Sequence, residues 1–494
     1  MFPSLASTTL VALTLLAHAG FGSAVSVLEE CLAPAVSRVA FEGDLLYQAT
    51  AVKRFNLDID VSPAAVTYPE SAEEVASVVR CAAHNGYHVQ AVSGGHSYGN
   101  YGFGGVSGAV VVNLENLQQF HMNTTTWEAT IGAGTLLGDV TKRLSAAGGR
   151  AMSHGTCPQV GSGGHFTIGG LGPTSRQFGA SLDHVIEVEA VLANSSIIRA
   201  SETENPDVFF AVRGAASGFA IVTEFKVRTE PEAGEAVKYS YSFEFGDTAS
   251  RADLFKKWQA YVARPGLTRK LASTLTLLER GILITGTFFG TEEEYKRLRI
   301  EEEFPGANDS SAIVFKDWLG LVASWGEDVV LQLGAGVSAH FYAKSRSMTA
   351  ESLLSDAEVE AMFEYLDNVD KGTPLWFAIF DFQGGAVNDV PTGATAYAHR
   401  DTLIWLQSYA INLLGDVSRT TVEFLDRLNE LTLAHNATDL LYGAYPGYVD
   451  PRLEDGPEAY WGENLPRLQR IKAEIDPNDV FHNPQSVQPG VPSA

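Results

Sequence analysis

Two residues, His96 and Cys157, bring nucleophilic side chains into glycine-rich surroundings. His96 stands in Ser93-Gly94-Gly95-His96-Ser97-Tyr98-Gly99, and Cys157 lies near the start of a second tract, which runs from Gly155 to Gly170. Imidazole and thiol groups can both bond covalently to an electrophilic cofactor. A lone histidine or cysteine more often only packs in a core, so it is the glycine tracts that favour chemistry here.

The two tracts also suit a ligand that carries phosphate. A backbone without side chains can approach a diphosphate closely and donate N–H groups to it. The first tract follows directly on residues 87–92, which are typical of a short strand. Together the tracts predict a large, flat ligand held by main-chain groups.

The segments around the tracts predict an α+β region. A strand starts at Ala65, and Ser71 with Glu74 forms a capping box that opens an amphipathic helix ending at Gly86. Further expected elements are strands over 87–92, 109–114 and 219–229, a helix over 137–147, and a hairpin of 185–193 with 196–201.

Beyond Pro231 the pattern changes to that of a second α+β region. Apolar residues alternate with polar ones over 237–245, which is the period of an antiparallel strand buried on one face. We expect an antiparallel sheet with helices over one face. Its other strands are expected over 281–289, 375–382 and 402–409, its helices over 251–262 and 355–367, and a final helix over 460–476.

Composition excludes some classes of function and points to secretion. The 494 residues carry a formal net charge of −25, which repels nucleic acid and anionic membrane surfaces. Residues 1–24 have no charged side chain, contain a short apolar run and end in small residues, as a secretory signal peptide does. No later apolar stretch is long enough to span a bilayer. Four N-x-[ST] sequons predict glycosylation at Asn123, Asn194, Asn308 and Asn436.

The sequence contains three cysteines: Cys31, Cys81 and Cys157. In an oxidising compartment two of them should pair, which leaves one free thiol to be explained.

These motifs resemble those of the secreted flavoprotein oxidases of the berberine bridge enzyme type, which have the vanillyl-alcohol oxidase fold. The resemblance rests on both glycine tracts and on the closing motifs Tyr460-Trp461-x-x-Asn464-Leu465 and Asp476-Pro477-x-Asp479-Val480-Phe481. Within that family, segments 99–105, 380–385 and 396–401 are most similar to the fungal glucooligosaccharide and chitooligosaccharide oxidases.

The resemblance implies FAD tethered twice, by His96 to its 8α-methyl carbon and by Cys157 to C6. It leaves Cys31 and Cys81 as the disulfide pair. It divides the chain into a signal peptide (1–24), an FAD-binding domain (25–230), a substrate-binding domain (231–440) and a C-terminal segment (441–494) that returns to the FAD domain. Other cofactor-binding residues expected on this basis are Ser93, Gly94, Gly95, Ser97, Tyr98, Val160, Gly161, Gly163, Gly164 and His165.

Strand parity singles out Asp381 on the substrate side. It shares a face with Phe377, Ile379 and Gln383, and a lone carboxylate among apolar neighbours is costly without a partner. It either caps the turn before Gly384 or, as the resemblance implies, assists a tyrosine base.

Tyr448 aligns best with the base tyrosine of the family, with Tyr442 and Tyr445 as alternatives. A free tyrosine has a pKa near 10, so the site must lower that pKa or let Asp381 share the proton. Substrate contacts are expected from Tyr98, Tyr101, Phe377, Ile379 and Gln407. The glucooligosaccharide pattern has tryptophan and glutamine where this chain has Phe377 and Ile379, which leaves the sugar open.

The resemblance implies a secreted, monomeric oxidase that converts the reducing-end C1 hydroxyl of an oligosaccharide to a lactone and reduces O₂ to hydrogen peroxide. Val160 either packs a turn or, as in oxidases of the family, leaves room for O₂ at the flavin. Two alternatives remain: an oxidase of a secondary metabolite with the same fold, and a flavoprotein that binds glycans without turnover.

Overall fold

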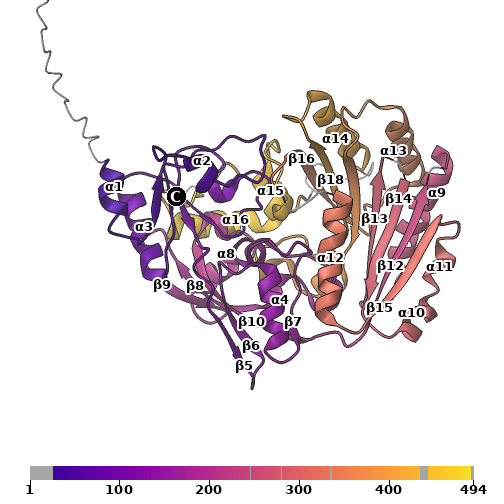
Figure 1. Cartoon of the computed structure of the whole chain (residues 1–494), viewed down its shortest axis with the longest axis horizontal. Coiled ribbons are helices and arrows are strands. Elements are labelled where there is room, and N and C mark those ends of the chain that lie inside the picture. Colours follow the sequence, from indigo (N-terminus) through magenta and orange to yellow (C-terminus); the bar gives the residue numbers. More distant parts are fainter. Residues whose placement is uncertain (1–25, 245, 280, 334–336, 434–442, 491–494) are drawn as a thin grey trace, which may run out of the picture.

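The structure is a computed structural model that describes residues 26–490, apart from 245, 280, 334–336, 434–442 and the side chains of 328–333 (Figure 1). The expected signal peptide, the sequon at Asn436 and the alternative base Tyr442 therefore lie outside the described residues. Over the part of the chain that is described, no helix has the length and apolar character needed to cross a membrane.

The first half of the chain builds two sheets that share one core. The four-stranded sheet has the order β1-β2-β4-β3 and the five-stranded antiparallel sheet the order β5-β6-β10-β8-β9. The strands are β1 (Val39–Phe41), β2 (Ala65–Thr67), β3 (Val89–Val92), β4 (Val110–Asn113), β5 (Phe120–Asn123), β6 (Glu128–Gly132), β8 (Val185–Val191), β9 (Ile197–Ser201) and β10 (Ile221–Arg228), with β7 (Arg150–Ala151) pairing β11 (Glu230–Pro231). The expected hairpin is confirmed, since β8 pairs with β9.

Helix α3 (Ala72–His84) packs between the two sheets, where it contacts β3, β4, β8 and β9. Its Ser71 side chain accepts from the Glu74 N–H, as the expected capping box requires. The prediction of the reciprocal bond, from the Ser71 N–H to the Glu74 side chain, is wrong. The Glu74 carboxylate instead accepts from the Glu70 N–H, one residue before the N-cap. The other helices of this half are α1 (Val27–Leu32), α2 (Tyr47–Thr50), α4 (Leu137–Ala146), α5 (Ser162–Ile168), α6 (Ser175–Phe178), α7 (Ser181–His184) and α8 (Pro206–Val212).

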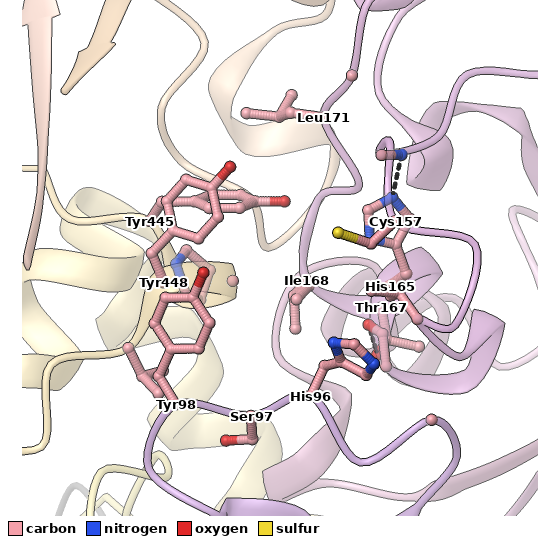
Figure 2. A pocket seen from close by; sticks show the side chains of 18 of the residues that line it. His96, Ser97, Tyr98, Cys157, His165, Thr167, Ile168, Leu171, Tyr445 and Tyr448 are labelled. Atoms are coloured by element: carbon pink, nitrogen blue, oxygen red, sulfur yellow. Dashed lines mark hydrogen bonds between the residues drawn. The ribbon is translucent and has the colours of Figure 1, made fainter. Parts of the chain in front are cut away.

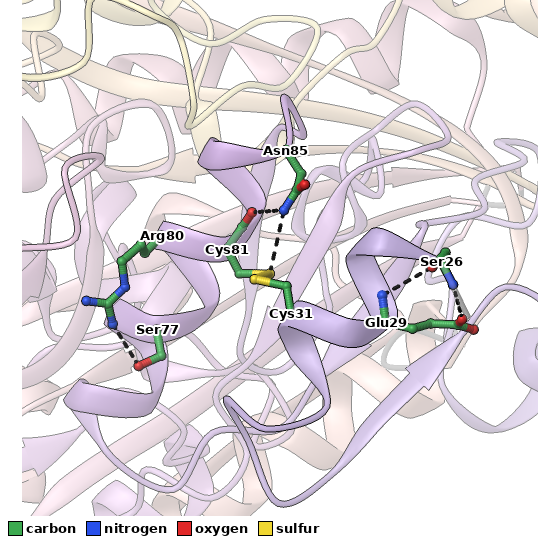
Figure 3. Close-up of a disulfide and its surroundings, with 7 residues drawn as sticks. All are labelled: Ser26, Glu29, Cys31, Ser77, Arg80, Cys81 and Asn85. Carbon is green, nitrogen blue, oxygen red and sulfur yellow. Dashed lines mark hydrogen bonds between the residues drawn. A yellow bond between two sulfur atoms is a disulfide. The ribbon is translucent and has the colours of Figure 1, made fainter. Parts of the chain in front are cut away.

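A disulfide joins Cys31 on α1 to Cys81 on α3, which confirms the expected pairing (Figure 3). Cys157 remains a free thiol. The sequon asparagines Asn123, Asn194 and Asn308 are all exposed, as glycosylation would require.

The second half forms a seven-stranded antiparallel sheet in the order β15-β12-β14-β13-β17-β18-β16. Its strands are β12 (Ala236–Glu244), β13 (Leu271–Leu278), β14 (Gly281–Phe288), β15 (Asp309–Phe315), β16 (His340–Thr349), β17 (Trp376–Phe382) and β18 (Thr402–Asn412). The accompanying helices are α9 (Thr248–Val262), α10 (Glu292–Leu298), α11 (Ile300–Glu303), α12 (Trp318–Leu333), α13 (Asp356–Asn368) and α14 (Arg419–Leu431). The fold class is therefore α+β, as expected.

One face of this sheet is covered by helices, because alternate strand residues such as Tyr239, Leu275 and Phe380 share a buried cluster with Trp258 of α9 and Leu425 of α14. Helix α12, which the sequence reasoning missed, contacts β15 and also α4 of the first half. Its Trp325 donates a hydrogen bond to Thr287 on the face opposite that cluster (3.1 Å). The opposite face of the sheet is thus turned toward the first half of the chain.

The last segment, with α15 (Gly456–Trp461) and α16 (Leu465–Ile475), packs back against the first half of the chain. Lys472 of α16 is fully buried, and its ammonium donates to the Gly218 carbonyl (2.7 Å), the Asp476 carboxylate (2.6 Å) and the Phe481 carbonyl (2.9 Å). A buried charge needs such a set of partners because water is excluded.

Replacing Lys472 by methionine is therefore expected to lower the free energy of unfolding by about 3 to 5 kcal/mol, since it leaves the Asp476 charge buried without its cation. Denaturant unfolding measures this loss. In the control Lys226→Met, which removes a part-exposed pair with Glu128, the loss should stay below about 1 kcal/mol. Equal losses in both variants would contradict the role given to Lys472.

Candidate active site

A cavity of about 500 Å³ lies between the glycine tracts of the first half and the face of the seven-stranded sheet opposite the Trp258 cluster. Figure 2 shows His96 and Cys157 on one side of it, with Tyr445 and Tyr448 facing them from the other. All of the expected cofactor-binding and substrate residues line this cavity: Ser93, Gly94, Gly95, His96, Ser97, Tyr98, Tyr101, Cys157, Val160, Gly161, Gly163, Gly164, His165, Phe377, Ile379, Asp381, Gln407 and Tyr448.

The two tracts touch backbone to backbone, and this contact requires glycine on both sides. A Cβ atom added to Gly94 would lie 2.3 Å from the Gly161 nitrogen, and one added to Gly161 would lie 2.2 Å from the Gly94 nitrogen. A Cβ atom added to Gly163 would lie 2.7 Å from the Ala133 carbonyl oxygen. Residues 162–168 form helix α5, where the second tract predicts a glycine loop, and these contacts explain why the helix carries glycine at its start.

The cavity has the donors that an anionic, flat cofactor requires. Among the described residues, the amide N–H groups of Gly94, Gly95, His96 and Ser97 have no protein acceptor, so four consecutive donors remain for a ligand. A Cβ at Gly164 would meet open space, which leaves room for a ring system. Among the described residues that line it there is one lysine, Lys238, and no arginine, so a diphosphate there would be bound mainly by main-chain amides. The tracts thus fit FAD.

His96 and Cys157 both face the cavity, and burial determines the protonation state of each. Burial lowers the pKa of His96 to about 4, so its imidazole is neutral at physiological pH and keeps a lone pair for bond formation. Burial also raises the pKa of the Cys157 thiol, and Thr156 partly offsets that effect by hydrogen bonding. Cys157 therefore carries its proton until a bond is formed.

His165 and Val160 hold or border the Cys157 loop. The His165 Nε2 accepts from the Gly155 N–H (2.9 Å), and burial lowers the pKa of this imidazole to about 3. His165 thus fixes the start of the second tract as a neutral acceptor. The Val160 N–H donates to the Cys157 carbonyl (3.3 Å) across a tight turn, which places both side chains on the cavity.

Asp381 lies on β17 and is bonded to the neighbouring strand. Its Oδ1 accepts from the Thr274 hydroxyl of β13 (2.8 Å), and burial raises its pKa to about 6. The alternative role as a cap of the following turn has no bond to support it, because among the described residues the Asp381 carboxylate accepts from Thr274 and from no N–H of the Gly384–Gly385 turn.

Of the base candidates that the structure describes, Tyr448 has the freer hydroxyl. Tyr445 is tied to the second tract, since its hydroxyl accepts from the Gly170 N–H (2.8 Å). Among the described residues, the Tyr448 hydroxyl has no hydrogen-bond partner, and the ring stacks on Tyr98 (5.9 Å between centroids). Burial and the nearby charge of Asp381 raise the pKa of Tyr448 well above 10. Of the two alternatives, a lowered tyrosine pKa or proton sharing with Asp381, this raised pKa favours the second.

The expected substrate residues differ in their freedom to bind a ligand. Gln407 donates to the Tyr98 hydroxyl (2.9 Å), which links the sheet to the first tract. The Tyr101 hydroxyl donates to Gln485 (2.7 Å), so Tyr101 contributes a wall and no free polar group. Phe377 stacks on Tyr409 (5.1 Å), and Ile379 lies on the same apolar wall.

Sequence reasoning missed the residues that β13, β14 and the C-terminal segment contribute to the cavity. These are Thr274, Thr276, Thr285, Thr287, Phe481, Asn483 and Gln485. The signal for β13 was available, since Thr274, Leu275, Thr276 and Leu277 alternate with a period of two. The C-terminal residues carry no such pattern.

Comparison with known proteins agrees with this site. Residues 63–201 match a family model described as FAD binding domain, and residues 444–488 match one described as berberine and berberine like. The chain is 42% identical to the FAD-linked oxidoreductase sorD of Penicillium rubens, over 94% of this chain and 99% of that protein. It is 35% identical to the glucooligosaccharide oxidase of Sarocladium strictum, over 88% and 89% of the two chains.

Among solved structures, the glucooligosaccharide oxidase of Acremonium strictum superposes with a TM-score of 0.85 at 33% identity, and the match covers 94% of this chain and all of that one. That structure was studied for its 6-S-cysteinyl, 8α-N1-histidyl FAD. The site of the present chain thus lies in a fold whose relatives carry covalent flavin.

Proposed function

Because this chain belongs to the FAD-linked oxidoreductases of the berberine bridge enzyme type, which include carbohydrate oxidases, we propose that it oxidises the reducing-end C1 hydroxyl of an oligosaccharide to a lactone and uses O₂ as the electron acceptor. The observation that supports this most is that Tyr448 faces His96 and Cys157 across one cavity (Figure 2), which Asp381 also lines. It gives a proton acceptor and a cofactor anchor on opposite sides of a bound alcohol.

FAD is bound through both residues in this proposal, His96 by a ring nitrogen and Cys157 by sulfur. The neutral imidazole of His96 and the free thiol of Cys157 are each able to form such a bond. The bound flavin supplies a hydride acceptor that O₂ reoxidises with release of hydrogen peroxide. Two anchors would keep the cofactor from being lost into dilute extracellular fluid.

The chain's own contribution is a proton relay. Tyr448 begins as a neutral phenol because its pKa is raised, whereas Asp381 with a pKa of about 6 is mostly charged at neutral pH. The Tyr448 oxygen takes the proton of the substrate hydroxyl while its own proton passes to Asp381. Asp381 is thus the final proton acceptor.

Secretion and glycosylation also form part of the proposal. The disulfide between Cys31 and Cys81 suits an oxidising compartment, and the sequons at Asn123, Asn194 and Asn308 are accessible to the glycosylating enzyme. The net charge of −25 disfavours nucleic acid as a partner. We propose that the secreted form is a monomer.

A second candidate, an oxidase of a secondary metabolite, is favoured by the apolar wall of the cavity. Phe377 and Tyr409 of this wall stack on each other, Phe341 of the next strand stacks on Tyr409, and each of the three is less than 9% exposed. Rings that are already stacked on each other offer a sugar little free face, whereas they suit an apolar substrate.

A substrate panel read by hydrogen peroxide release separates these candidates. Gluco-, xylo- and chitooligosaccharides test the first candidate, and apolar primary and secondary alcohols test the second. Peroxide from the sugars supports the proposal, and peroxide from the apolar alcohols alone overturns it in favour of the second. Binding of glycans without any peroxide would show a non-catalytic flavoprotein.

Val160→Ile should slow reoxidation by O₂, because an added methyl group beside the Cys157 anchor would narrow the space that O₂ must enter. Reduction by substrate, and reoxidation by an artificial dye, should stay nearly unchanged. Stopped-flow measurement of each half-reaction checks this. An unchanged O₂ rate, or equal losses in both half-reactions, would show that Val160 only packs the turn.

A further inference from the structure

Thr274 and Asp381 form a pair across two neighbouring strands. They lie directly opposite each other in the antiparallel register of β13 and β17, and the Thr274 Oγ1 donates to the Asp381 Oδ1 at 2.8 Å. It is the one hydrogen bond that the Asp381 side chain accepts from a described residue. Burial raises the pKa of Asp381, and the Thr274 hydroxyl is the group that opposes this effect.

The pair also decides which way the carboxylate points. Threonine has a branched Cβ and few rotamers, and both residues stand on inner strands of the sheet, so the donor has little freedom to move. With Oδ1 engaged by Thr274, Oδ2 is the oxygen that remains for Tyr448. Loss of the hydroxyl would free the carboxylate to rotate and would leave its charge without a donor.

The other groups around Asp381 do not replace this donor. Trp405 faces it from β18, and Thr285 stands beyond Thr274 on β14. The titratable group next to it is Tyr448, whose further neighbours are the titratable Tyr98, Tyr445 and Cys157. Of the cations on neighbouring elements, Arg176 bonds the Gln383 carbonyl and Lys238 stands opposite Thr287 on β14. Within the described residues, neither cation bonds to the Asp381 carboxylate.

We propose that Thr274 is a positioning residue for proton removal from the substrate: it holds the Asp381 carboxylate turned toward Tyr448 and stabilises its charged form. The inference rests on the proposed function, in which Asp381 is the final proton acceptor. It adds Thr274, a residue of a different strand, to the relay, and assigns its hydroxyl the role of orienting the Asp381 carboxylate.

The test compares Thr274→Val with Thr274→Ser. Valine keeps the branched shape and removes the donor, so the acid limb of the rate of flavin reduction should move to higher pH by about one to two units. Serine keeps the hydroxyl and should restore the original midpoint. A direct readout is the infrared carboxyl band that disappears in Asp381→Asn, whose titration midpoint should move with the rate profile in Thr274→Val.

Thr285→Val is the matched control for the midpoint: Thr285 also lines the cavity, but it pairs with Thr274 on the side away from Asp381 and gives no bond to Asp381. Its midpoint should equal that of the unmutated protein. An unchanged midpoint in folded Thr274→Val, in both the rates and the infrared titration, would overturn the inference; Thr274→Ala serves as a second variant without the hydroxyl. Failure of the proposed function gives a different result. In that case the flavin of Asp381→Asn would be reduced by substrate at the normal rate at every pH.

Discussion

Replacing Tyr448 by phenylalanine is expected to slow the reduction of bound flavin by substrate about 10²- to 10⁴-fold, the usual contribution of a positioned base. The phenol oxygen is the atom that takes the substrate proton in the relay, and phenylalanine keeps the ring that stacks on Tyr98. Asp381→Asn should also slow this step, because the final acceptor is lost. Anaerobic stopped-flow measurement of flavin absorbance follows the step directly.

The same relay predicts how the rate depends on pH. Asp381 accepts a proton only as the carboxylate, so the rate of reduction should fall as the pH drops through about 6. This limb should be absent from the residual rate of Asp381→Asn.

Tyr445→Phe is the matched control for Tyr448→Phe, since the two rings lie 5.0 Å apart in one short segment. The Tyr445 hydroxyl binds the Gly170 N–H, so its loss removes one neutral hydrogen bond and should cost less than about tenfold. A large loss in Tyr445→Phe with a near-normal rate in Tyr448→Phe would make Tyr445 the base. Near-normal rates in both would move the role to Tyr442.

The second large effect concerns retention of flavin after denaturation. The purified protein should be yellow, and its flavin should remain with the polypeptide after acid precipitation. Either His96→Ala or Cys157→Ala alone should leave the flavin attached through the other residue, whereas the double variant should release all of it. Flavin fluorescence of the precipitate and the mass of the intact chain measure this outcome.

His165→Ala controls for general damage to the cavity, because His165 lines the same wall and binds the Gly155 N–H but is not an anchor in the proposal. Its flavin should survive denaturation. If the unmutated chain released all of its flavin, the double attachment would be refuted, and release from one of the single variants would show that the other residue is not an anchor.

Much of the fold could be predicted because the decisive signals are local. The helix after Ser71 and the alternation of residues 237–245 both depend on residues within a few positions of one another. Helix α5 was missed because glycine is a poor helix former, and its glycines are required because Gly161 and Gly163 approach other backbone segments closely. Helix α12 was missed because its apolar residues do not follow one clear face.

The residues of the site also fall into those that local sequence patterns predict and those that they do not. His96 and Cys157 could be predicted because the glycine tracts mark them in the sequence. The bond from Thr274 to Asp381 joins residues 107 positions apart, and it depends on a strand register that no local pattern determines. The choice between Tyr445 and Tyr448 likewise depends on which hydroxyl the Gly170 N–H captures, which only the folded chain shows.

The return of the C-terminal segment has a consequence for how the protein is made. The Val89 N–H of β3 donates to the Val480 carbonyl (2.7 Å), and Phe481, Asn483 and Gln485 supply part of the cavity wall beside the first tract. A ribosome that has synthesised the first tract must still translate nearly 400 residues before that wall is present. Binding of the flavin therefore has to follow synthesis of nearly the whole chain. A chain released before Val480 is added would lack part of the wall of the flavin pocket.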